Sequence, residues 1–493
     1  MLGIEDVGGA ENFFDLGGHS LLATRIATAL RSELGLDFTT EHIMRHPTVH
    51  SLAENIPPPI SEDDSIRRRY GSRYPLSLLQ QGLLSQAPDG YRVATDDLAC
   101  AFRLRGQVDM SRLRRAVAEV MRRHASLRTT FALEASAEPS QLVRHRMRVP
   151  LTSYPDQGPD IAGQISGARD RPFDIANGPL FEVVFFALDT AEQIALIRFS
   201  KLIADDASMD IFIREVSEFY ADGAGGRLSS DDPSVHYPQF AQWQRKTLAQ
   251  EQVDDCIRYW NNLLRDGRRP PAASSREGVR ESRQLTFPPA IVRPLHALGR
   301  AHGAGLSRVL EAALGVSLAL TSGGQQATLA ATVTHRPMPE LHSAIGPFTY
   351  FRPVLVSLRG ARTLGMLLDR MQDLASTEPG PLPLEFLQGK TGLSQFSLMA
   401  RLVLRPATPE PLCLPGVEAT QIDLPSHSVQ PAGLHVSFTE HAGGLIGRVD
   451  SGPACPYDGR RVADMLTWLL TSVSGQEDTL IPVGGTRREG PDA

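Results

Sequence analysis

At 493 residues the chain is too long for one ordinary hydrophobic core, so two or three folding units are expected. A net charge of −6 spread over this length gives no reason to expect nucleic-acid binding. The four cysteines are far apart and match neither a disulfide framework nor a zinc motif, which favours a reducing, cytoplasmic location. No apolar run approaches the ~20 residues that cross a bilayer, and no signal peptide opens the sequence, so no membrane contact is expected.

Residues 1–56 are predicted to form a small all-α unit. The stretch SLLATRIATALRSELG begins with Ser20, a favoured N-cap residue, and then places leucine and isoleucine side chains four apart on one helical face. Two glycines before Ser20 permit a tight turn and leave this serine exposed at a helix N-terminus. Such a serine is either a simple N-cap or an attachment point for an anionic group, which the helix dipole favours.

A histidine series in the same unit invites a metal interpretation. His42, His46 and His50 fall four apart, but Pro47 interrupts the helix that would align them. No cysteine or carboxylate completes a ligand set, so no metal site is expected.

The rest of the chain is predicted to be a linker and two α/β lobes. Residues 57–72 are proline-rich and then charged, without periodicity. The mixture of strands and helices that follows indicates lobes at 73–235 and 236–478, with a flexible tail at 479–493. The clearest elements are a strand at 98–106, a helix at 110–124, a buried strand at 194–199, a helix at 254–264 and two strands within 434–450.

The N-terminal unit resembles the peptidyl carrier domains of nonribosomal peptide synthetases. NFFDLGGHSLLATRI matches their signature almost residue for residue, and the match continues through HPTVHSLAENI. The resemblance implies that Ser20 carries a 4′-phosphopantetheine arm with a thioester-linked peptide, and that His19 flanks the arm. It also implies an N-terminally trimmed module of a longer synthetase, with upstream adenylation and condensation domains and a downstream thioesterase domain.

From about residue 73 the chain resembles a condensation domain. The stretches YPLSLLQQGLL, RRHASLRTTF, YPQFAQWQ and IGPFTYF match or approach its landmarks. The resemblance implies two chloramphenicol-acetyltransferase-like lobes arranged as a V with a tunnel between them.

The central motif of that family, His-His-x-x-x-Asp-Gly, is altered in RFSKLIADDASMD. Ser200 and Lys201 replace the two histidines, Asp205 keeps the aspartate, and Asp206 replaces the glycine. A lysine of ordinary pKa is cationic near pH 7 and cannot accept a proton as a neutral imidazole can. The resemblance therefore implies a loop without a catalytic residue, in which Asp205 pairs with an arginine; Arg128 is the candidate partner.

A carrier followed by such a domain resembles the X-domain arrangement of glycopeptide-antibiotic synthetases. In that family the motif has lost its catalytic histidine and ends in Asp-Asp, and the domain recruits cytochrome P450 enzymes that cross-link the carrier-bound peptide. The alternative is a condensation domain with residual amide- or ester-forming activity, because condensation can be largely positioning. A structural spacer between modules is a third interpretation, but it gives no role to the carrier serine.

Overall fold

The computed structural model describes most residues from 72 to 473 and part of the segment before residue 57. The described residues are 8–13, 16, 26, 27, 30, 34, 36, 38, 40–56, 72–86, 97–133, 138–154, 160–188, 192–222, 233, 235–265, 281–337, 339–377, 380, 382–388, 390, 400–405, 410–422, 424, 433–441, 443–453, 455–473 and 481.

The chain folds into two compact units, and both are built from more than one stretch of sequence. The first unit contains Met1–Ala249, His335–Phe348 and Glu410–Leu424, and the second contains the remainder. This division differs from the lobe boundary expected at residues 235–236, because the chain up to Ala249 belongs to the first unit. Two later segments also return to the first unit, which the order of elements along the sequence does not reveal.

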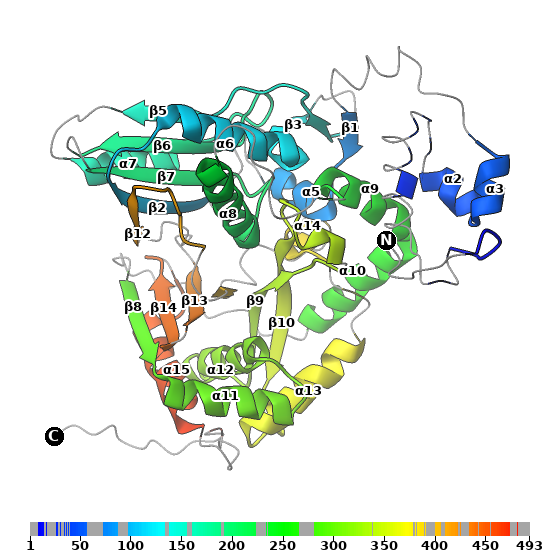
Figure 1. Cartoon of the computed structure of the whole chain (residues 1–493). Helices are drawn as coiled ribbons and strands as arrows, with labels where there is room; N and C mark the ends of the chain where they lie inside the picture. Colours follow the sequence, from blue (N-terminus) through cyan, green and yellow to red (C-terminus); the bar gives the residue numbers. More distant parts are fainter. Residues whose placement is uncertain are drawn as a thin grey trace. The chain divides into compact units, whose positions relative to one another are not determined.

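A five-stranded sheet forms the centre of the first unit (Figure 1). In spatial order its strands are β12 (Glu418–Ile422), β2 (Leu98–Arg105), β7 (Glu192–Phe199), β6 (Phe181–Ala187) and β5 (Leu151–Tyr154). Only β5 and β6 run parallel; the other neighbours are antiparallel. Helices α6 (Met110–Arg123) and α8 (Asp206–Asp222) pack together and share a core with the sheet, so the sheet has a buried, apolar face.

A small sheet and several short helices complete the first unit. The small sheet has the order β1-β4-β3 and is antiparallel throughout. These elements are β1 (Ser72–Pro75), β4 (Ser140–Val143), β3 (Thr129–Ala132), α5 (Leu78–Ser85), η1 (Ala125–Arg128), α7 (Ile161–Asp170), α9 (Tyr237–Thr247) and η2 (Pro339–Leu341).

A six-stranded sheet forms the centre of the second unit. In spatial order its strands are β10 (Thr349–Ser357), β9 (Gln326–Thr334), β11 (Ala400–Arg405), β13 (Leu434–His441), β14 (Gly444–Ser451) and β8 (Glu281–Phe287). The helices of this unit are α10 (Gln250–Arg265), α11 (Pro289–Ala301), α12 (Leu306–Thr321), α13 (Leu364–Thr377), α14 (Leu384–Gln388) and α15 (Gly459–Ser472). Strand β11 runs parallel to both of its neighbours, whereas the other pairs are antiparallel.

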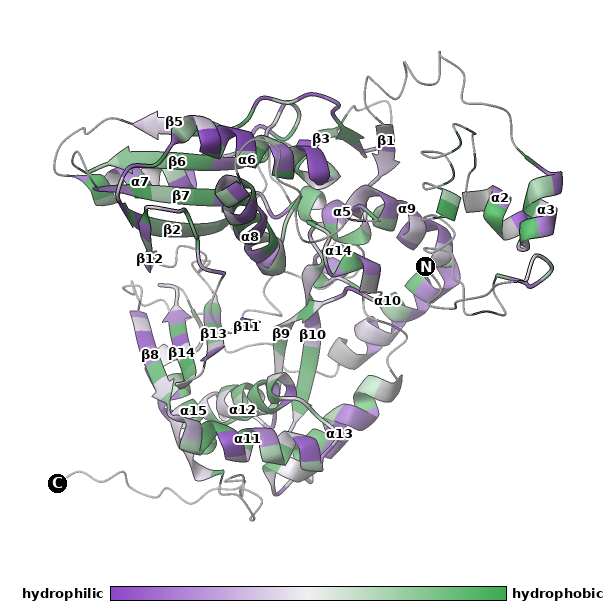
Figure 2. Cartoon of the chain, viewed as in Figure 1, coloured by the Kyte–Doolittle hydropathy of each residue, from purple (hydrophilic) through white to green (hydrophobic). Residues whose placement is uncertain are grey.

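Hydropathy follows these layers. Strand β6 is coloured mainly as hydrophobic in Figure 2, and α12 is buried along most of its length. Among the described residues no single helix is long and apolar enough to span a membrane; α11 and α12 pass that test only as a pair bent by 99°.

The strands and helices expected in residues 98–450 are confirmed, whereas most of the helix expected from Ser20 lies outside the described residues. Helix α6 begins after Asp109, whose side chain accepts hydrogen bonds from the backbone amides of Ser111 and Arg112, as an N-cap does. The expected strands at 98–106 and 194–199 correspond to β2 and β7, and the two strands within 434–450 correspond to β13 and β14.

The described part of the N-terminal unit contains two short helices, α2 (Thr40–Arg45) and α3 (Val49–Glu54). Thr48 and Ser51 form a capping box at the start of α3, directly after Pro47. The buried apolar residues in the described part of residues 1–56 are Phe13, Ala27, Phe38 and Ile43.

Candidate functional site

The altered motif lies in the tight connection between β7 and α8. Strand β7 ends at Phe199, whose ring stacks on Phe181 and contacts Phe212 of α8 edge-on. The next residue, Ser200, is buried; its amide donates to the carbonyl of Leu180 at 2.8 Å, and its hydroxyl accepts from the amide of Leu202 at 3.3 Å. Ser200 therefore closes the turn that leads from the strand to the helix.

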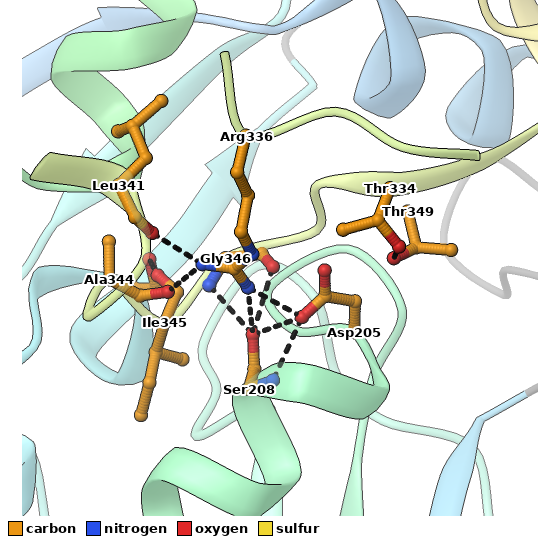
Figure 3. A network of polar contacts seen from close by, with 10 residues as sticks. Asp205, Ser208, Thr334, Arg336, Leu341, Ala344, Ile345, Gly346 and Thr349 are labelled. Carbon is orange, nitrogen blue, oxygen red and sulfur yellow. Dashed lines mark hydrogen bonds and ion pairs between the residues drawn. The ribbon is translucent and has the colours of Figure 1, made fainter. Parts of the chain in front are cut away.

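Asp205 is the residue around which this loop is built. Its Oδ1 accepts from the backbone amide of Ser208 at 2.9 Å, so Asp205 is the N-cap of α8. The same oxygen accepts from Nη2 of Arg336 at 2.9 Å, and both side chains are nearly inaccessible, at 3% and 8% exposure (Figure 3). A buried, charge-assisted hydrogen bond of this kind is strong, and it is costly to break because a buried charge would remain unpaired.

Arg336 also fixes the segment that carries it. Its Nη1 donates to the carbonyls of Leu341 at 2.6 Å and Ala344 at 2.7 Å (Figure 3). Its guanidinium lies 4.2 Å from the centroid of the Phe348 ring. The ion pair with Asp205 thus attaches the whole segment His335–Phe348 to the N-terminus of α8.

Ser208 and Gly346 form a second attachment between the same two pieces of chain. The Ser208 hydroxyl accepts from the Gly346 amide at 3.0 Å, and its one proton can go to Oδ1 of Asp205 at 2.5 Å or to the Gly346 carbonyl at 2.9 Å. A Cβ on Gly346 would lie 2.3 Å from the ring of Tyr237, so only glycine fits at this position. Tyr237 in turn donates to the hydroxyl of Ser77 at 2.7 Å, and burial raises the pKa of its phenol.

Lys201 and Asp206, the other two altered positions, are partly exposed. Gln80 holds the intervening turn by donating to the carbonyl of Leu202 at 2.9 Å. Asp206 opens α8, and its charge contributes, after burial, to the raised pKa of Asp210 one turn along the helix. The structure therefore brings Ser200, Lys201, Asp205 and Asp206 into one loop, where Ser200 and Asp205 are used for folding.

The expected pairing of Asp205 with Arg128 is wrong. The Arg128 guanidinium donates to three backbone carbonyls, those of Met121, Arg122 and Arg144, at 2.8, 3.3 and 2.8 Å. Its position at the end of the short helix η1 directs it toward these carbonyls and away from the motif loop.

The stretch RRHASLRTTF supplies a second buried polar cluster next to α8. Glu215 accepts from Nε of Arg123 at 3.2 Å and contacts Nε2 of His124 at 2.8 Å, and all three side chains are buried. Two residues on, the Ser126 hydroxyl donates to the carbonyl of Ile345 at 2.6 Å. The histidine of this stretch is therefore committed to Glu215, and its serine binds the same segment as Arg336.

One imidazole remains of chemical interest near the loop. His335 precedes Arg336 in the sequence, its amide donates to the carbonyl of Phe348 at 2.9 Å, and burial lowers the pKa of its imidazole. A lowered pKa favours the neutral form, which can accept a proton at pH 7.

Sequence reasoning missed Arg336, Ser208, Gly346 and His335. The role of Ser208 could have been predicted from the sequence, because a serine three residues after Asp205 at a helix start is typical of a capped N-terminus. Arg336 lies 131 residues from Asp205, and no local pattern connects the two. Ser20 and His19 lie outside the described residues, so the carrier site stays a prediction from the sequence.

Comparison with known families supports the division of the chain. Residues 71–403 match the family model "Condensation domain", and residues 1–56 match "Phosphopantetheine attachment site". The first match covers more than half of the chain. The chain belongs to the condensation-domain family. Its N-terminal module is a carrier whose cofactor is covalently attached 4′-phosphopantetheine.

The curated relatives are peptide synthetases much longer than this chain. One plipastatin synthase subunit from Bacillus subtilis (strain 168) is 27% identical over 468 residues, which cover 91% of this chain and 18% of the relative. Surfactin synthase subunit 2 from the same strain is 26% identical over 449 residues, which cover 88% of this chain and 12% of the relative. The condensation-type domain and its carrier thus correspond to a small part of these synthetases.

Solved structures confirm the chloramphenicol-acetyltransferase-like fold of the condensation-type domain. The X-domain in "Complex of the X-domain and OxyB from Teicoplanin Biosynthesis" matches with a TM-score of 0.67 and 23% identity, over 84% of this chain and 95% of that one. The condensation domain from the Monacolin K polyketide synthase MokA matches with a TM-score of 0.67 and 18% identity, over 84% and 100%. Both X-domains and condensation domains therefore share this fold.

Proposed function

We propose that this chain holds a peptide on phosphopantetheinyl-Ser20 and that its condensation-type domain is a docking domain without catalytic activity. The domain recruits cytochrome P450 enzymes, which cross-link the peptide on the neighbouring carrier. The carrier supplies the substrate, the docking domain supplies the partner, and neither step needs chemistry in the loop between β7 and α8.

The contacts of the motif loop are the observation that carries this proposal. Ser200 closes a turn, Asp205 caps α8 and pairs with Arg336, and Lys201 stands where the family has its second histidine. No imidazole from residues 200–206 is available to accept a proton or position an amine. Because the aspartate is fully used in holding His335–Phe348, its retention is explained by folding and does not require catalysis.

The choice of partner is supported by the X-domain from teicoplanin biosynthesis, which has been solved in complex with OxyB. That domain and this one share a fold, and in this chain a carrier module precedes the domain. We infer from this likeness that P450 enzymes of the same biosynthetic cluster bind the condensation-type domain of this chain.

Calorimetry with the full chain tests recruitment. Each candidate P450 is titrated into the chain that carries a peptide on phosphopantetheinyl-Ser20 and into the Ser20→Ala variant, which cannot carry the arm. Binding that survives Ser20→Ala with a Kd within about threefold of wild type supports docking by the condensation-type domain. Binding that requires Ser20 places recognition on the loaded carrier, and an absence of binding to every P450 of the cluster contradicts the proposal.

Residual condensation is the second candidate, and His335 is the observation that favours it. Its neutral imidazole lies in the segment that Arg336 attaches to the motif loop. If the domain forms amide bonds, His335→Ala should lower the rate about 10²–10⁴-fold, the usual range for a general base. If it is a docking domain, neither wild type nor Lys201→His forms amide from aminoacyl groups loaded on the carrier; robust activity of Lys201→His would refute the non-catalytic role.

A further inference from the structure

A strongly basic surface lies beside the point where the linker enters the condensation-type domain. Five arginines contribute to it: Arg122, Arg128, Arg144, Arg146 and Arg148. Two hydrogen bonds bring the separate stretches together: Nη1 of Arg128 donates to the carbonyl of Arg144, and Nη2 donates to the carbonyl of Arg122. We call these five residues the arginine face.

The arginine face has little negative charge to balance it. Residues 139–154 contain no aspartate or glutamate. Arg146 and Arg148 are exposed and have no hydrogen bond or ion pair to other described residues, whereas Arg122 pairs with Glu119. Burial, and to a smaller extent the nearby charge of Arg122, lower the pKa of Arg128.

Packing presents these arginines to solvent. Met147 and Val149 are partly buried against the apolar core of the first unit, whereas Arg146 and Arg148, which alternate with them, are exposed. Arg144 is held in place by bonds from its guanidinium to Thr130 and to the carbonyl of Ala176. Arg146 and Arg148 therefore present their charges to solvent beside the anchored Arg144.

The carrier of the same chain has the complementary charge. Residues 1–56 contain eight carboxylate side chains and three arginines, which gives −5 of the net −6 of the chain. The remaining 437 residues are close to neutral, so the negative charge of this protein is concentrated in its carrier.

The register of β1 places the tether of the carrier next to the arginine face. Ser72, where the linker ends, pairs with Val143 in an antiparallel ladder. The chain before Ser72 therefore leaves the sheet at the same end as Arg144, which follows Val143. A linker of residues 57–71 spans at most about 50 Å when extended, which lets the carrier reach the face. Such a tether gives an effective carrier concentration on the order of millimolar.

We propose that the acidic carrier docks in cis on the arginine face, as a resting position between its encounters with partner enzymes. Attraction between an acidic and a basic surface at this effective concentration holds the carrier close without an apolar interface. High salt releases it, because the Debye length falls to about 3 Å at 1 M. This docking needs only the carrier and the domain, so it does not depend on P450 recruitment.

Small-angle X-ray scattering of the full chain tests the docking. At about 0.01 M salt the wild-type chain should be compact, and at about 1 M salt its radius of gyration and maximum dimension should increase. Arg146→Glu combined with Arg148→Glu should give the extended values already at low salt. Arg146→Lys with Arg148→Lys keeps the charge and should remain compact.

A matched control separates this face from overall charge. Arg293→Glu with Arg300→Glu makes the same charge change on exposed arginines of α11 in the second unit and should behave as wild type. The proposal is overturned if wild type is already extended at low salt, or if the Arg146/Arg148 reversal stays compact. If the Arg146/Arg148 charge-reversal variant stays compact and no longer binds the P450, the arginine face is a binding surface for the P450 and not for the carrier.

Discussion

Helices α8 and α12, the central helices of the two units, resemble each other in their buried charged residues and differ at their first residue. Each buries a glutamate: Glu215 of α8 contacts Arg123 and His124, and Glu311 of α12 accepts from Arg308 and Arg352. In both units the buried carboxylate attaches the helix to a separate stretch of chain. The two clusters are therefore structural, and their residues lie outside the altered motif.

The helices differ at their first residue. Helix α12 starts after Gly305 without a side-chain cap, whereas α8 starts after Asp205, which caps the helix and pairs with Arg336. The ion pair between Asp205 and Arg336 resembles the clusters of Glu215 and Glu311, because in each case a buried carboxylate attaches a distant stretch of chain to a helix. The comparison indicates that the one motif residue retained in this chain now stabilises the fold.

Removing a buried glutamate should have the largest effect. Glu215→Ala leaves Arg123 and His124 buried without their carboxylate and should lower the free energy of unfolding by about 3–5 kcal/mol, and Glu311→Ala should cost a similar amount. Urea denaturation followed by circular dichroism measures both. As a control, Glu119→Ala breaks only the exposed pair with Arg122 and should cost about 1 kcal/mol or less. Equal stability of Glu215→Ala and Glu119→Ala would contradict the structural role.

Asp205→Asn should have an intermediate effect. The amide oxygen can still cap α8, but the charge that Arg336 needs is lost, which should cost about 1.5–3 kcal/mol. Asp206→Asn is the matched control, because Asp206 is the neighbouring, partly exposed carboxylate. Chemical denaturation of the two variants side by side gives the difference. If both are as stable as wild type, the ion pair with Arg336 does not hold the segment, and the aspartate must be retained for another reason.

Replacing His335 should have the smallest effect, which is a change in how steeply stability falls between pH 7 and pH 5. Burial lowers the pKa of this imidazole, so the unfolded chain binds its proton more readily than the folded protein. The stabilisation is present above the ordinary pKa of about 6.5 and is lost as the pH falls below it. Melting temperatures measured between pH 7 and pH 5 should fall less steeply for His335→Gln than for wild type. The exposed His145→Gln serves as control and should keep the wild-type slope; an unchanged slope in His335→Gln would show that His335 is not the group responsible.

Much of the fold was predictable from the sequence, because it rests on local patterns. Strand patterns and apolar runs identified β2, β7 and the β13–β14 pair, and amphipathic periodicity identified α6. The motif residues Ser200, Lys201, Asp205 and Asp206 were identified by resemblance to the family motif, directly after the buried strand that is β7.

The partner of Asp205 was not predictable, because it depends on contacts between distant stretches. Arg128 was the expected partner, yet a short 3₁₀ helix directs its guanidinium to backbone carbonyls. Arg336 comes from a segment whose flanking strands, β9 and β10, belong to the other unit. Nothing in the composition of His335–Phe348 distinguishes it from an ordinary loop of that unit.

The return of two late segments to the first unit also determines when that unit can be complete during synthesis. Strand β12 forms one edge of its sheet by pairing with β2, and Arg336 supplies the charge that Asp205 needs. Both arrive only after Ala249, where the longest stretch of this unit ends. On the ribosome, Asp205 is therefore made without its cation, and the edge of β2 stays uncovered until Leu424 has emerged. A protein cut after Ala249 would keep that unfinished edge permanently.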